Sequence, residues 1–338
     1  MSQEMRRYTP EGLIDLLNQP QVIERFKGLA QEHLSAERML FLAIECVRRN
    51  PTLGECDHLS VLGAMITSHS LGLEPNTPLG HAYLIPYKGW TKDDNGKWVQ
   101  KQAECNFQIG YRGFAQLFHR TGKVLTFSAN AIREKDKFSA VEGTNTEVSY
   151  SKALANRGKI LGSYCHINKA NGGQDFELLE LDEILKIRDT SETYKSLVKG
   201  VEQAKAKNDK KEQAKAEAKL ADTPWVKWED IMAAKPAVKR LAKISDLDSS
   251  VVMAAEIDSL SDVGKADFKQ VAEAKDRDEI FNTFASQQGR QAIAAPGQND
   301  QPIPKMDLDN MPGQPEPEKV AAKPPQQHYQ NSNYANSF

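Results

Sequence analysis

The sequence is poor in cysteine, has no long apolar run and carries no closely spaced cysteine pair. Its 338 residues include four cysteines, and none of them forms a CxxC motif. A structural zinc site of the usual spacing is therefore not expected. No run approaches the roughly 20 apolar residues that a membrane-spanning helix needs, and the first residues lack the apolar core of a signal peptide. We expect a reduced, cytoplasmic protein with no membrane partner, in which the thiols are packing residues.

The common motifs of phosphate, metal and covalent chemistry are also missing. The sequence contains no GxxxxGK[ST] loop, no HExxH pair and no nucleophile elbow, so the usual residues for ATP hydrolysis, zinc binding and serine catalysis are lacking. The short runs Cys56-Asp57-His58 and Cys165-His166 are better explained by packing or helix caps than by metal binding. We expect no metal, no cofactor and no enzymatic activity, and the residues indicate binding rather than bond-making.

The net charge is only −2, but the charges are unevenly distributed. Residues 81–137 contain ten Lys and Arg against five Asp and Glu, and residues 224–243 contain five against two. Residues 244–290 reverse the balance, with five against ten. A basic middle can attract phosphates even when the whole chain is close to neutral.

The stretch from Gly72 to Phe114 predicts a β-hairpin. Two alternating apolar and polar runs flank residues 93–96, whose Asn-Gly pair tolerates positive φ. The first run carries Tyr83 and Tyr87 beside Lys88, and aromatics interleaved with basic residues suit a surface that holds nucleic acid. A half-buried hairpin with ordinary solvated lysines explains the same pattern, and the pattern alone favours that simpler interpretation.

Apolar spacing predicts the other elements. Helical spacing indicates helices over residues 10–31, 35–50 and 58–71, the first of them interrupted at Pro20. A short helix should follow Arg112. Alternation then indicates strands over residues 123–133, 145–151, 159–168 and 175–179, and a helix begins near Leu181.

The later part of the chain has three regions of different composition. Residues 200–222 are rich in Ala, Lys, Glu and Gln without an apolar stripe, which predicts an exposed helix or a mobile loop. Thr223-Pro224 then begins a helix, in which Pro236 predicts a kink or a break. For the tryptophans of this helix we favour core positions. Two further helices are expected before residue 288, and the Pro- and Gln-rich remainder should be disordered.

Four stretches together form a pattern that is more specific than any single motif. They are AERMLFLAIECVRRNPTLGECD, LGLEPNTPLGHAYLIPY, QIGYRGFAQLFHRTGKV and TPWVKWEDIMAAKPAVKRLAK. They cover roughly residues 13 to 250 and resemble the RecT family of phage-type single-strand annealing proteins, which is related more distantly to Redβ.

This resemblance implies an α+β fold, in which a small antiparallel sheet and a hairpin pack among helices. It implies ATP-independent binding of single-stranded DNA and annealing to a duplex, as an oligomeric ring or filament. The implied partners are a RecE-type exonuclease and a host single-stranded-DNA-binding protein. Two alternatives remain open: a nuclease-type DNA-modifying enzyme, and a scaffold that recruits recombination or replication proteins.

The resemblance also implies domain limits and DNA contacts. We expect an annealing core over residues 1–250 with a charged insertion at 200–222, a small acidic helical region at 251–290 and a disordered tail at 291–338. The insertion and Pro236 depart from the family pattern. The candidate DNA-binding residues are Tyr111, Arg112, Lys123, Arg133, Lys235, Lys239, Arg240 and Lys243.

Overall fold

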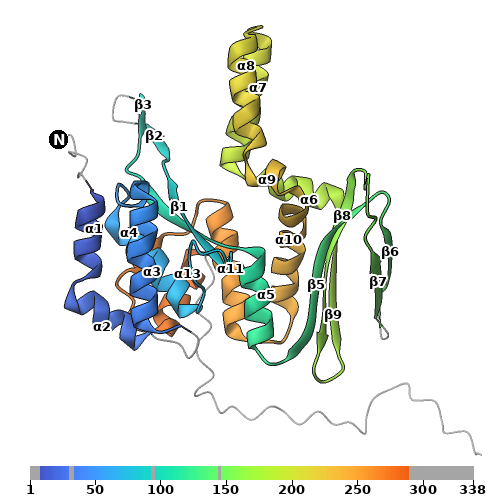
Figure 1. Ribbon diagram of the computed structural model, residues 1–338, viewed down its shortest axis with the longest axis horizontal. Coiled ribbons are helices and arrows are strands. Elements are labelled where there is room, and N and C mark those ends of the chain that lie inside the picture. The colour runs from blue at the N-terminus through green and yellow to red at the C-terminus, as the bar shows by residue number, and fades with distance from the viewer. Residues whose placement is uncertain (1–7, 30–33, 93–95, 144–145, 289–338) are drawn as a thin grey trace, which may run out of the picture. The chain divides into compact units, whose positions relative to one another are not determined.

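The computed structural model describes residues 8–29, 34–92, 96–143 and 146–288, and it confirms the expected α+β architecture (Figure 1). Helices surround small antiparallel sheets, and one hydrophobic core runs through the described part of the chain. All four cysteines are buried and free, as expected for packing residues. Within the described ranges, no helix is both long enough and apolar enough to cross a membrane.

The N-terminal helices pack around one central helix. They are α1 (Pro10–Leu17), α2 (Pro20–Gly28), α3 (Ala36–Arg49) and α4 (His58–Ser70), with a 3-10 turn, η1 (Pro51–Leu53). Ser35 caps α3 by accepting a hydrogen bond from the backbone N–H of Arg38, and Asp57 caps α4 in the same way. Every residue of α4 from Ser60 onward is buried. A helix buried on all sides belongs at the centre of the core.

The predicted hairpin is present. Strand β1 (Ala82–Tyr87) pairs antiparallel with β4 (Glu104–Ile109), so that Ala82 faces Ile109. Beyond them, β2 (Trp90–Lys92) pairs with β3 (Trp98–Gln100). Residues 93–95 of the predicted turn lie outside the described residues, and Gly96 has a φ of 75°.

Three glycines allow the start of the hairpin to pack against α5 (Tyr111–Arg120). Gly80 has a φ of 66°, a conformation that side chains disfavour. A Cβ on Gly110 would overlap the carbonyl oxygen of Gly80, and a Cβ on Gly113 would overlap that of His81. These close backbone contacts fix where β4 ends and α5 begins.

The larger sheet has the strand order β5-β8-β9 and is antiparallel. Its strands are β5 (Val124–Arg133), β8 (Ile160–Lys169) and β9 (Gln174–Glu180), and the separate hairpin is β6 (Lys137–Val141) with β7 (Glu147–Ser151). Helix α10 (Glu229–Ile244) packs against all three strands. On the sheet, Tyr164 packs against Phe138 of β6 and Tyr150 of β7, which join the two sheets. The sequence pattern had not indicated β6.

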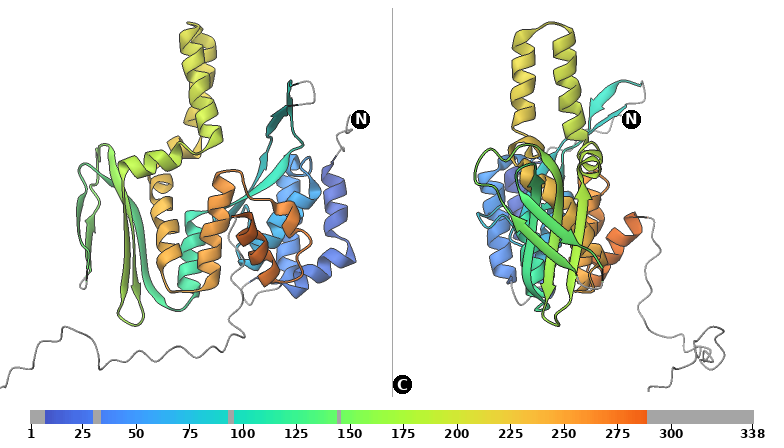
Figure 2. Two further views of the ribbon diagram at one scale, coloured as in Figure 1. Left: turned by 180° about the vertical axis from the view of Figure 1, so that it is seen from behind. Right: turned by 90° about the vertical axis from the view of Figure 1, so that its right-hand side faces the viewer.

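Residues 200–222 are helical, which agrees with the first of their two predicted states. Helix α6 (Leu181–Arg188) leads into α7 (Glu192–Ala206), and α8 (Lys210–Ala221) returns beside it. Figure 2 shows α7 and α8 side by side as a projecting helical hairpin. Val201 and Ala204 are buried there, whereas α8 has no buried residue.

The predicted interruption at Pro236 is wrong. Helix α10 continues through Pro236, which is buried against the core. The helix breaks earlier, at Trp228, which has a φ of −123° and separates α9 (Pro224–Lys227) from α10. Burial of the surrounding face therefore outweighs the backbone hydrogen bond that proline cannot donate.

The last described helices complete the same core. They are α11 (Ser249–Asp262), α12 (Phe268–Val271) and α13 (Arg277–Gln287). Phe268 packs edge-on against Phe107 of β4 and against Phe284 of α13. Residues 289–338, which include the predicted tail, lie outside the described residues.

Replacing Gly113 with alanine tests the close packing of α5. We expect Gly113→Ala to lower the free energy of unfolding by about 1–3 kcal/mol, because the new methyl group overlaps the His81 carbonyl. Gly200→Ala in the exposed helix α7 is the matched control, since a Cβ there meets nothing within 4 Å. It should raise stability by about 0.5–1 kcal/mol. Urea unfolding measures both, and equal effects would contradict the packing argument.

Candidate nucleic-acid interface

Strand β1 presents an aromatic face to solvent. Tyr83, Ile85 and Tyr87 alternate along the strand and are 44%, 38% and 44% exposed. Ala82 and Leu84, which point the other way, are buried in the core. The alternation follows from the two-residue period of a strand. We call the exposed residues Tyr83, Ile85 and Tyr87 the β1 strip.

Basic side chains lie at the two ends of the β1 strip. A Cβ on Gly80 would lie 3.2 Å from the Tyr83 hydroxyl and 3.7 Å from Arg112 Cδ, so these two side chains are neighbours. At the other end, a Cβ on Gly89 would lie 3.6 Å from Lys101 Cδ and 3.8 Å from the Tyr87 ring. Each end of the strip therefore pairs a tyrosine with a cation.

Arg112 differs from the other predicted contacts because its charge is available. Its side chain is exposed on the first turn of α5, and it makes no ion pair with another described residue. The strip itself spans about 13 Å, since residues on one strand face repeat every two positions. Exposed rings that can stack on bases, bordered by cations that can bind phosphates, suit a single strand of nucleic acid.

Tyr111 and Lys123 lie beside the strip in sequence but are engaged elsewhere. The Tyr111 hydroxyl donates to the Ala129 carbonyl at 3.1 Å, and its ring packs on Phe127. Burial raises the pKa of Tyr111 to about 12. Lys123 Nζ donates to the carbonyl of Leu247 at 2.5 Å. DNA contact by these two residues stays a prediction.

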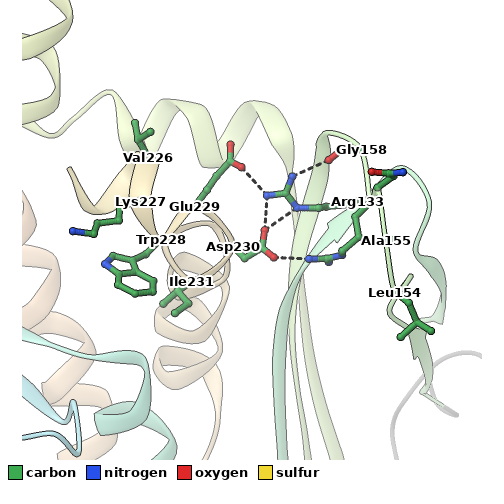
Figure 3. A pocket seen from close by; sticks show the side chains of 12 residues that line it. Arg133, Leu154, Ala155, Gly158, Val226, Lys227, Trp228, Glu229, Asp230 and Ile231 are labelled. Atoms are coloured by element: carbon green, nitrogen blue, oxygen red, sulfur yellow. Dashed lines mark hydrogen bonds and ion pairs between the residues drawn. The ribbon is translucent and has the colours of Figure 1, made fainter. Parts of the chain in front are cut away.

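Arg133 lies in an ionic cluster at the start of α10 (Figure 3). Its guanidinium donates to Asp230 and to Glu229, each at 2.6 Å. Arg157 bridges Asp230 to the buried carboxylate of Asp136. Hydrogen bonds from Arg157 hold the pKa of Asp136 well below its usual range. A hollow of about 590 Å³ borders this cluster.

The two predicted contacts at the centre of α10 are buried. Lys235 and Lys239 are 6% and 8% exposed, and both reach Asp258 of α11, at 2.9 Å and 3.2 Å. Lys239 also pairs with Asp262. Burial by itself would lower the pKa of Lys239, but Asp258 and Asp262 together raise it. Burial likewise opposes ionisation of Asp258, yet the two lysines keep its pKa below the usual value.

Arg240 and Lys243 are more exposed but also paired. Arg240 donates to Glu177 at 3.0 Å and to Glu183 at 2.9 Å, and Lys243 pairs with Glu256 at 3.0 Å. Phosphate contact by these two residues and by Arg133, Lys235 and Lys239 stays a prediction, and it would require each to give up a carboxylate. The charge excess counted along the sequence is thus largely spent inside the fold.

One preference for the core is wrong. Trp225 packs against the core, but Trp228 is 57% exposed because the break between α9 and α10 turns it outward. Within the described ranges, no three His, Cys, Asp or Glu side chains are grouped to hold a metal ion. Asp57 caps α4, and His166 contacts Gln174 at 2.8 Å, in line with the expectation of caps and packing.

Comparison with known proteins assigns the family. The sequence profile of the RecT family matches residues 37–280. The chain is 30% identical to Protein RecT of Escherichia coli strain K12 over 249 residues, which cover 73% of this chain and 80% of that protein. It is 27% identical to the uncharacterized protein YqaK of Bacillus subtilis strain 168 over 119 residues, which cover 35% of this chain and 36% of that protein. The chain belongs to the RecT family and is a recombination protein.

Neutralising Asp258 tests the buried charge cluster. We expect Asp258→Asn to lower the free energy of unfolding by about 3–5 kcal/mol, because it leaves two buried lysines short of a counter-charge. The folded-state pKa of Asp258 lies below the unfolded value of about 3.9. Its stabilisation is therefore present above that unfolded value and is lost as the pH falls through the folded-state value.

Urea unfolding followed by circular dichroism measures the loss at neutral pH. Asp222→Asn is the matched control, since Asp222 forms an ion pair with Lys227 in which both side chains are exposed, and it should leave the unfolding midpoint unchanged. A wild-type midpoint for Asp258→Asn would contradict the role assigned to the cluster.

Proposed function

We propose that this protein binds single-stranded DNA without ATP and anneals complementary strands, as a cytoplasmic homo-oligomer and not as an enzyme. The observation that carries the proposal is the β1 strip with Arg112 and Lys101 at its ends, on a chain that belongs to the RecT family. The strip combines exposed rings with cations, which is the composition expected of a sequence-tolerant single-strand site.

Annealing asks little chemistry of such a site. No covalent bond forms or breaks, so the protein has to neutralise phosphates and keep bases accessible for pairing. Arg112 and Lys101 would bind phosphates and release counterions, which makes affinity fall with salt. Tyr83 and Tyr87 would stack on bases whatever the sequence, because every base has an aromatic face. Oligomerisation would align many weak sites along one strand.

The proposed partners follow from the same chemistry. Annealing needs exposed single strands, so we propose an exonuclease of the RecE type as the supplier. A host single-stranded-DNA-binding protein is the second proposed partner, because it covers the same strands. The chain's own contribution is then pairing alone.

An annealing assay tests the proposal directly. Two complementary labelled oligonucleotides are mixed without ATP, and duplex formation is followed by fluorescence quenching. We expect the protein to accelerate pairing, with the acceleration falling as salt rises. Non-complementary strands are the control and should show no quenching. Pairing at the protein-free rate, at low salt and with excess protein, would reject the proposal.

Comparing two arginines tests where the phosphates bind. Arg112→Ala should reduce the slope of log affinity against log salt by about 0.7, the value for one single-strand phosphate contact. Arg240→Ala is the matched control, because Arg240 is held by Glu177 and Glu183, and it should leave the slope unchanged. Fluorescence anisotropy with a short oligonucleotide measures both.

The opposite result is equally clear. If Arg240→Ala lowers the slope and Arg112→Ala does not, the phosphates lie along α10, and the β1 strip is not the interface. In that case the Arg240 ion pairs exchange for DNA, as the family resemblance implies.

A further inference from the structure

The start of α10 carries an exposed apolar knob. Trp228 and Ile231 are 57% and 45% exposed, although both are large apolar residues. In Figure 3 both side chains project from the side of α10 that faces away from Arg133. A tryptophan held outward by a helix break is a strong anchor for a protein interface. We call Trp228 and Ile231 the knob.

A hollow of matching character lies on α3. It has a volume of about 430 Å³ and is formed by α3 and residues 74–79. Phe41 and Leu79, which line it, are 56% and 48% exposed. Its size falls within the range of about 300–1,000 Å³ typical of clefts that receive small apolar groups. We call this cleft the α3 hollow.

The charges around the knob and the α3 hollow are complementary. Beside the knob, two guanidinium groups meet three carboxylates, so one negative charge is left over; these residues are Arg133, Arg157, Asp136, Glu229 and Asp230. Around the α3 hollow, three guanidinium groups meet two carboxylates, so one positive charge is left over; these residues are Arg38, Arg48, Arg49, Glu45 and Glu74. Opposite excesses favour docking and steer its orientation.

The knob cannot be the partner of the hollow on its own chain. Figures 1 and 2 place α3 and α10 on opposite sides of the β1–β4 hairpin. We propose that the knob of one copy inserts into the α3 hollow of the next copy. This inference rests on the homo-oligomer included in the proposed function, and it adds which two surfaces meet.

Such a contact has a defined consequence for assembly. Because two different patches meet, each added copy leaves one knob and one hollow unoccupied at the ends. A heterologous contact of this kind closes into a ring or continues as an open filament. It also repeats the β1 strip in one orientation, which would align successive DNA sites along a strand.

A mixing experiment tests the contact with full-length chains. Trp228→Ala removes the knob and keeps the hollow, and Phe41→Asp blocks the hollow and keeps the knob. Both positions are more than half exposed, so both variants should fold. Leu125→Ala, at another exposed apolar position on β5 (65% exposed), is the matched control. Light scattering after gel filtration, with and without a short single-stranded oligonucleotide, gives the masses.

We expect wild type and Leu125→Ala to form large assemblies, and each blocked variant alone to run at its protomer mass of about 37.7 kDa. An equal mixture of the two blocked variants should form a dimer and nothing larger, because only one intact knob and one intact hollow meet. The proposal is overturned if wild type stays monomeric, if either variant assembles alone, or if the mixture remains monomeric.

DNA binding separates this contact from the proposed function. The two blocked variants keep the β1 strip and should bind a short oligonucleotide with an affinity close to that of one wild-type site. If wild type assembles as described but binds no single strand, the contact stands and the annealing function fails. If it binds and anneals DNA while the mixture stays monomeric, the function stands and the contact fails.

Discussion

The carboxylate of Asp258 is the interaction on which the middle of the molecule depends. It is fully buried on α11, where it accepts hydrogen bonds from Lys235 and from the backbone N–H of Ile109. Through it, α10, α11 and the end of β4 meet at one point. A charge buried this deeply is stable only while its partners stay in place, so the helix that looks most suited to binding DNA is instead held by its lysines in the interior.

That constraint moves the candidate interface to the hairpin. With the cations of α10 paired, the exposed combination of aromatic and basic side chains lies on β1 and at the start of α5. The glycines Gly80, Gly110 and Gly113 bring these two elements together, because their backbones approach where a side chain would not fit. Arg112 is thereby placed beside Tyr83. Recognition of single strands and packing of the core thus share one short stretch of chain.

Local patterns in the sequence were sufficient for most of the secondary structure. Capping by Ser35, the hairpin pairing and the helical state of the charged insertion all depend on neighbouring residues, and all were open to prediction. The errors came where distant packing outweighs local preference. Pro236 stays inside α10 because that face is buried, and Trp228 is exposed because the helix breaks beside it. Neither effect depends on nearby residues alone.

The sequence by itself determined the family, the α+β class and the basic character of the middle of the chain, because motif order and charge counts are properties of the chain alone. Only the tertiary structure decided which of those charges remain available. Lys239 and Arg112 look equally suited to phosphate in the sequence, yet one is buried between two carboxylates and the other is exposed beside Tyr83. An ion pair depends on residues that folding brings together, here 23 positions apart in the chain, and linear composition cannot show which cations will be neutralised in this way.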